Sequence, residues 1–190
     1  MKKFNNNPEI SIVFFGETWS GKTCLLNRYF TNTYKIHPPT VMPNYLLKEQ
    51  KRKIDNNEVT IRVRLIDTPG QIRYISTNQL ILARAQGIVL IYDITSLETF
   101  TSLNELIKIA NQCNSSSKIL IGLKLDLEDK RVIQKEEAEA FSNKYKMKYY
   151  EISALNGEKV NELFDDIMNY FIMNNISFIK EQMTYKPITI

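Results

Sequence analysis

The chain has 190 residues, of which 43% are hydrophobic and 24% are charged, as in an ordinary single globular domain. Its net charge of +4 is too small to indicate nucleic-acid binding, so we expect no nucleic-acid partner. The sequence contains one histidine, His37, and two distant cysteines, Cys24 and Cys113, which argues against a zinc site, a disulfide framework and a Ser-His-Asp triad. No apolar run approaches the roughly 18 residues of a membrane span, and the first residues lack the apolar core of a signal peptide. We therefore expect a cytoplasmic protein.

Strand and helix patterns alternate along the whole chain. Residues 59–66 alternate apolar and polar side chains after a turn at 55–58, which predicts a hairpin with 44–54. The other expected strands are 9–15, 87–92, 118–123 and 148–152, and the expected helices are 24–30, 103–110, 134–145 and 160–172. This order predicts an α/β fold with a mostly parallel sheet. In such folds the ligand binds at the carboxyl ends of the strands.

Residues 16–23 read GETWSGKT and match the pattern GxxxxGK[ST] between an expected strand and an expected helix. In that context backbone N–H groups and the helix N-terminus bind phosphate. Lys22 is expected to reach the β- and γ-phosphates, and the Thr23 hydroxyl to bind Mg²⁺. The predicted nucleotide contacts here are Glu17, Thr18, Trp19, Ser20, Gly21, Lys22, Thr23 and Cys24.

Further segments follow this loop in order: GKTCLLNRYF, PPTVMPNY, DTPGQ, YDIT, LKLD and SAL. Together they resemble the signature motifs of the Ras superfamily of small GTPases over residues 10–172. GKTCLL and ARAQGIVLIYDIT are most similar to Rab proteins, whereas PTVMPNY, GLKLDLEDK and SAL resemble the Rho branch. The resemblance implies a three-layer P-loop G domain over residues 8–172, with helices on both faces of a mostly parallel six-stranded sheet. The remaining residues, 173–190, are expected to form a C-terminal helical extension.

The resemblance also implies roles for the residues around the phosphates and Mg²⁺. Asp67 and Thr40 match the further Mg²⁺ contacts, and Thr40 also closes over the γ-phosphate. Gly70 matches the glycine whose amide senses that phosphate, and Gln71 the residue that orients the attacking water. Tyr34 lies where many members place an aromatic ring over the guanine.

On the base side, Asp126 matches the carboxylate that accepts the two guanine donors, and Lys124 the lysine whose stem packs along the base. Ser153, Ala154 and Leu155 match the segment that supports the base, with the Ala154 amide directed at O6. We expect GTP or GDP and Mg²⁺ as ligands.

Four departures from the family pattern weaken this assignment: Pro69 replaces an alanine, Ile72 replaces a glutamate, and two more concern the nucleotide directly. Leu123 replaces an asparagine and has no hydrogen-bonding group. Trp19 replaces a glycine, and its indole is expected either to cover the nucleotide or to block partners from the phosphates. Weaker affinity, altered nucleotide exchange, or both are therefore expected.

Residues 185–190 contain no cysteine, so we expect no lipid anchor there. An apolar stripe continues beyond residue 172 through Ile176, Ile179 and Met183. Two alternatives stay open for it: a helix covering the domain's own surface, or a helix docking on a second domain or partner.

The sequence thus favours a Rab-like guanine-nucleotide switch that hydrolyses GTP slowly. It would regulate vesicle traffic or signalling through effector, exchange-factor and activating proteins, and reach endomembranes through partners. The alternatives are a degenerate G domain acting as a scaffold with little or no GTPase activity, a Rho-like signalling GTPase, and an ATP-using phosphate-loop enzyme such as a small kinase. DTPGQ and Asp126 argue against the kinase.

Overall fold

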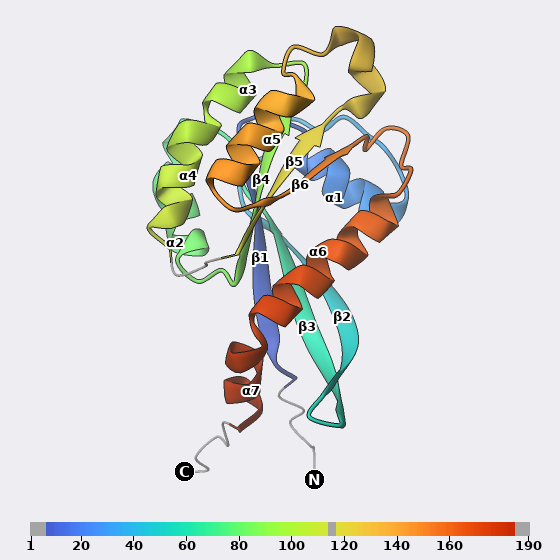
Figure 1. Ribbon diagram of the computed structural model, residues 1–190, viewed down its shortest axis with the longest axis vertical. Helices are drawn as coiled ribbons and strands as arrows, with labels where there is room; N and C mark the ends of the chain where they lie inside the picture. The colour runs from blue at the N-terminus through green and yellow to red at the C-terminus, as the bar shows by residue number, and fades with distance from the viewer. Residues whose placement is uncertain (1–6, 114–116, 185–190) are drawn as a thin grey trace.

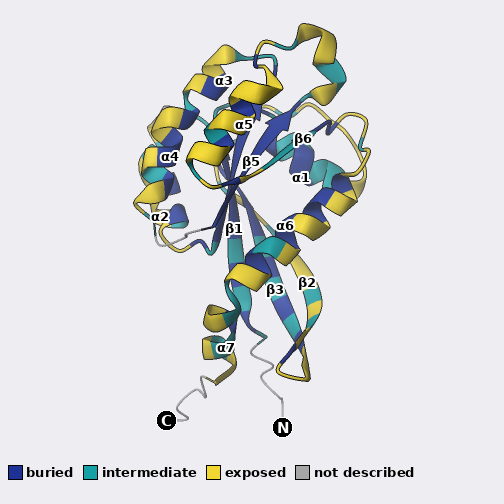
Figure 2. Ribbon diagram, viewed as in Figure 1, coloured by how far each residue is buried: buried dark blue, intermediate teal, exposed yellow. Residues whose placement is uncertain are grey.

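A computed structural model describes residues 7–113 and 117–184 of the chain. Its centre is a six-stranded sheet in the order β2-β3-β1-β4-β5-β6, in which only β2 is antiparallel to its neighbour (Figure 1). The strands are β1 (Glu9–Gly16), β2 (Asn44–Ile54), β3 (Asn57–Asp67), β4 (Gly87–Asp93), β5 (Lys118–Leu123) and β6 (Lys148–Ile152). Every residue of β4 and β5 is buried, because helices cover both faces of the central strands (Figure 2).

The helices divide between the two faces of the sheet. One hydrophobic cluster joins the sheet to α1 and α6, and the other joins it to α2, α3, α4 and α5. The helices are α1 (Lys22–Thr31), α2 (Ile75–Leu82), α3 (Leu97–Thr101), α4 (Leu103–Asn111), α5 (Lys135–Lys144), α6 (Val160–Asn174) and α7 (Ile176–Thr184), with short 3₁₀ helices η1 (Ile72–Tyr74) and η2 (Leu125–Lys130). The predicted α/β class with a mostly parallel sheet is confirmed, as is its layered architecture.

The expected strands and longer helices lie within one or two residues of those observed, but α2 and α3 were not predicted. In α2 only Asn78 and Leu82 are buried, so the helix carries no apolar stripe at a period of 3.6 residues. The five residues of α3 are too few to display any period, and the Ser96 side chain, which accepts a hydrogen bond from the Thr99 N–H, marks where that helix begins.

Residues 176–184, beyond α6, pack on the domain's own surface. Helix α6 runs to Asn174, past the expected boundary at residue 172, and α7 follows after a break at Asn175. Ile179 of α7 is fully buried in the core cluster of β1 and α6. Gln182 holds the backbone of Glu9 through two hydrogen bonds of 2.9 Å.

Of the two alternatives for the apolar stripe, the intramolecular one describes α7, although Met183 remains 40% exposed. Residues 185–190, on which the expected absence of an anchor rests, lie outside the described residues. No helix within 7–113 and 117–184 is long and apolar enough to cross a membrane.

Candidate functional site

The loop between β1 and α1 closes around the side chain of Lys22. This residue opens α1 and is only 5% exposed. Its Nζ donates hydrogen bonds to the carbonyl oxygens of Gly16 (2.9 Å) and Glu17 (2.8 Å). Burial lowers the pKa of Lys22 to about 8, although the nearby carboxylates of Asp67 and Glu17 favour the charged form. The buried ammonium lacks water around it, and an anion in the loop would replace that lost solvation.

Three oxygen-bearing side chains meet beside this loop. The Thr23 hydroxyl lies 2.6 Å from Asp67 Oδ2 and 2.9 Å from the Thr40 hydroxyl. Asp67 ends β3 and is 1% exposed, and burial raises the pKa of its carboxyl. Its second oxygen, Oδ1, is buried and has no hydrogen-bond partner among the described residues. Hard oxygen ligands with one unpaired carboxylate oxygen are a donor set that fits Mg²⁺.

The segment after β3 presses against the phosphate loop. A Cβ on Gly70 would lie 2.3 Å from the Thr18 backbone nitrogen, so only glycine allows this approach. Nearby, Thr18 Oγ1 and Gln71 Oε1 are buried and have no hydrogen-bond partner within the described part of the chain.

A cavity of about 400 Å³ extends from this point to the other side of the site. Of the predicted contacts it brings together Thr18, Trp19, Gly21, Lys22, Thr23, Cys24, Tyr34, Thr40, Gly70, Lys124, Asp126, Ala154 and Leu155. Five predicted residues do not line it, namely Glu17, Ser20, Asp67, Gln71 and Ser153. Of these, Glu17, Asp67 and Ser153 contact lining side chains directly.

The base side of the cavity is held in place by hydrogen bonds. Ser153 follows β6, and its Oγ donates to Asp126 Oδ1 at 2.5 Å while accepting from the N–H groups of Leu155 and Asn156, both at 3.1 Å. One oxygen of Asp126 is thus anchored, and the residue lines the cavity. A rigid carboxylate of this kind is suited to accept paired N–H donors.

Asp93, Arg28 and Leu127 also belong to this side of the cavity, and the sequence did not predict them. Asp93 Oδ2 pairs with Lys124 Nζ at 2.5 Å, which ties the end of β4 to the start of η2. From α1, Arg28 donates to the carbonyl oxygens of Ala154 (2.8 Å) and Leu155 (2.6 Å). Leu127 lines the cavity itself. No spacing rule relates these positions, because the contacts join segments up to 127 residues apart.

Two of the departures from the family pattern, Leu123 and Trp19, line the cavity. Leu123 is 1% exposed, and its Cδ1 lies 3.0 Å from where a Cβ of Gly21 would be. An apolar contact therefore joins β5 to the phosphate loop. Trp19 is 60% exposed and adopts a left-handed backbone with φ of 67°, which is unfavourable for a bulky residue.

Comparisons with known proteins agree with this geometry. A sequence profile described as the Ras family matches residues 11–173. The chain is 33% identical over 162 residues to human Ras-related protein Rab-30, an alignment that covers 82% of this chain and 76% of the relative. It is 32% identical to mouse Ras-related protein Rab-15 (80% and 72% covered) and 30% identical to Ras-related protein Rab-1D of Dictyostelium discoideum (93% and 84% covered).

A glycine-containing loop between β1 and α1 at the carboxyl edge of a mostly parallel six-stranded sheet defines the P-loop fold of GTP-binding proteins. The chain belongs to the Ras superfamily of small GTPases, on its Rab-like side. The family resemblance stated from the motifs is thereby confirmed.

Proposed function

We propose that this protein is a molecular switch that binds GTP or GDP with Mg²⁺ and hydrolyses GTP slowly. The observation that carries the proposal is the single cavity that joins both halves of a guanine-nucleotide site. At one end the Thr23 hydroxyl bonds to Thr40 and to Asp67 Oδ2, and Asp67 Oδ1 has no hydrogen-bond partner among the described residues. At the other end Asp126 is fixed by Ser153.

Different residues of the chain would bind the phosphates, the Mg²⁺, the base and the attacking water. Lys22 and the N-terminus of α1 neutralise the phosphates, which replaces the solvation that the buried ammonium lacks. Thr23, Thr40 and Asp67 would hold Mg²⁺, which supplies charge stabilisation at the phosphates. The remaining oxygen of Asp126 accepts N–H donors of guanine, and Arg28 holds the Ser153–Leu155 segment against α1. Gln71 orients the attacking water.

Partner proteins would distinguish the nucleotide-bound states through the segment that contains Thr40. Large apolar side chains there are exposed to solvent: Tyr34, Ile36, Val41, Met42, Tyr45 and Leu47. Thr40 lies beside Thr23 at the proposed metal position, so a γ-phosphate bound there would hold this segment through Thr40, and its loss would change the surface. We infer that effector, exchange-factor and activating proteins bind here, and the Rab-named relatives support a role in vesicle traffic or signalling. Residues 8–172 would form the G domain and 173–190 its extension.

A second candidate function is a scaffold that holds nucleotide without turning it over. Trp19 favours it, because a strained, 60% exposed indole in the phosphate loop stands where a partner would approach the phosphates.

Single-turnover hydrolysis of GTP separates the two functions. For the switch, Gln71→Ala lowers the rate at least tenfold and leaves GTP binding unchanged, whereas the exposed Gln79→Ala on α2 changes neither. Chromatography of the nucleotide released on denaturation shows which ligand the protein retains. Bound GTP that is never hydrolysed, with wild type and Gln71→Ala indistinguishable, would establish the scaffold instead.

A further inference from the structure

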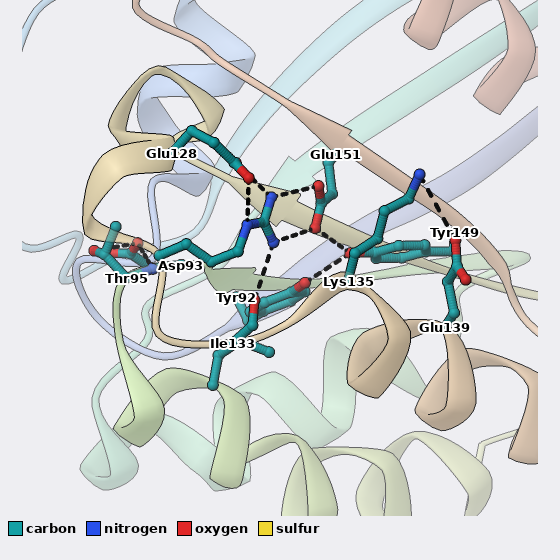
Figure 3. Close-up of polar contacts among 10 residues, drawn as sticks. Tyr92, Asp93, Thr95, Glu128, Ile133, Lys135, Glu139, Tyr149 and Glu151 are labelled. Carbon is teal, nitrogen blue, oxygen red and sulfur yellow. Dashed lines mark hydrogen bonds and ion pairs between the residues drawn. The ribbon is translucent and has the colours of Figure 1, made fainter.

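A buried arginine lies directly behind the base side of the cavity. Arg131 follows η2, and its side chain is 9% exposed. Its Nε and Nη2 donate to Glu128 (2.8 and 2.6 Å), Nη1 and Nη2 donate to Glu151 (2.8 and 2.7 Å), and Nη1 also donates to the Ile133 carbonyl (3.0 Å). All five guanidinium N–H groups are thus used, which no other side chain could do. Figure 3 shows Glu128, Glu151 and Ile133 arranged around this group.

The carboxylate of Glu151 extends the cluster into the sheet. Besides Arg131 it accepts a hydrogen bond from Tyr149, whose hydroxyl lies 2.9 Å from that of Tyr92 in β4 (Figure 3). The Tyr92 ring reaches across Gly122 of β5, where any Cβ would lie 2.8 Å from its hydroxyl oxygen. The cluster therefore crosses three neighbouring strands, β4, β5 and β6.

This cluster joins the two segments that carry the base contacts. Arg131 ends the stretch that contains Asp126, and Glu151 stands two residues before Ser153. The hydrogen bond from Ser153 to Asp126 spans the same two segments from the cavity side. A shift of η2 relative to β6 would therefore break that bond and turn Asp126 away.

With leucine at position 123, the position of residues 124–130 depends more strongly on the contacts at the two ends of this segment. Because its side chain forms no hydrogen bond, the segment 124–130 is held at its start by the Lys124–Asp93 ion pair and at its far end by Arg131. The first of these ion pairs involves a lysine side chain that is 35% exposed, whereas both partners of the Arg131–Glu151 pair are 9% exposed.

We propose that Arg131, Glu151 and Tyr149 are positioning residues that set the guanine preference of the site by holding Asp126 in register with Ser153. The inference rests on the proposed binding of guanine nucleotides. None of the three lines the cavity, so they act only through Asp126 and its loop.

The test compares dissociation of GDP and of inosine diphosphate from the full chain. Inosine lacks the exocyclic amine that guanine offers to Asp126, so the ratio of the two rates reports how well that carboxylate is placed. Arg131→Lys keeps the charge but offers three donors without the planar fork. We expect it to release GDP about tenfold faster and inosine diphosphate much less so, because one charge-assisted hydrogen bond corresponds to about that factor.

A milder variant and a matched control guard against simple loss of folding. Tyr149→Phe removes one hydroxyl and should shift the ratio in the same direction by only about threefold, because Arg131 still holds Glu151 in this variant. Lys108→Gln removes an exposed ion pair on α4 and should leave the ratio unchanged. Amide hydrogen exchange over residues 125–131 should quicken in Arg131→Lys and not in Lys108→Gln.

The proposal would be overturned if the variants lose thermal stability while the ratio of the GDP and inosine diphosphate dissociation rates and the amide exchange over residues 125–131 stay unchanged. The cluster would then only support the fold. If wild type binds no GDP, the proposed function fails. The exchange measurement then decides by itself whether the cluster holds the loop.

Discussion

Replacing Leu123 by asparagine should separate the stability of this protein from its affinity for nucleotide. The leucine is buried in the core cluster of β1, β5 and α6 and packs against Gly21 of the phosphate loop. It also lines the cavity between the phosphate and base ends. An amide at this position loses apolar burial but gains hydrogen-bonding groups beside both the loop and the ligand.

The two effects can be estimated separately. Full burial of a leucine side chain contributes about 2–3 kcal/mol, so Leu123→Asn should lower the free energy of unfolding of nucleotide-free protein by about that amount. One hydrogen bond from the amide to the nucleotide contributes about 1–1.5 kcal/mol, which corresponds to roughly tenfold tighter binding of GDP. We therefore expect a less stable protein with a higher affinity.

Urea denaturation of nucleotide-free protein gives the first quantity, and calorimetric titration with GDP and Mg²⁺ gives the second. Leu123→Ala is the matched control, because it removes the same packing and supplies no amide. It should lose about 2–4 kcal/mol of stability without any gain in affinity. If Leu123→Asn binds GDP no better than wild type, the reasoning that ties weak base-side contacts to this leucine is refuted.

Three further predictions concern the phosphate loop, α1 and α7. The pKa of Lys22 is 10.5 in the unfolded chain and about 8 in the folded protein, so between these pH values the unfolded state binds more protons and stability rises with pH. In urea titrations of nucleotide-free protein, the free energy of unfolding of wild type should therefore rise by roughly 3 kcal/mol relative to Lys22→Met from pH 8 to 10.5. Parallel pH profiles of the two proteins would contradict this. Arg28→Ala should release GDP about tenfold faster in stopped-flow measurements, because two carbonyls of the base-side loop lose their donor; an unchanged rate would show that the loop holds itself. Ile179→Ala should cost about 2–4 kcal/mol of unfolding free energy, whereas the exposed Met183→Ala should cost under about 0.5, and equal losses would mean that α7 is no part of the core.

Local patterns were sufficient wherever an element is apolar on a regular period or carries a motif with defined geometry. The strands β4 and β5 are nearly continuous apolar runs, and the phosphate loop has Gly16, Gly21, Lys22 and Thr23 within eight consecutive residues. Helix α2 left no such signal, because it buries only Asn78 and Leu82.

The sequence by itself therefore determined the α/β class, the alternation of strands and helices and the phosphate loop at residues 16–23, because those signals come from neighbours along the chain. Only the tertiary structure decided that α7 folds back onto β1, that Leu123 packs on Gly21, and that Arg131 meets Glu151 behind Asp126. These contacts join residues that are distant in the chain, so their energies depend on burial and distance in the folded domain and leave no periodic trace in the sequence.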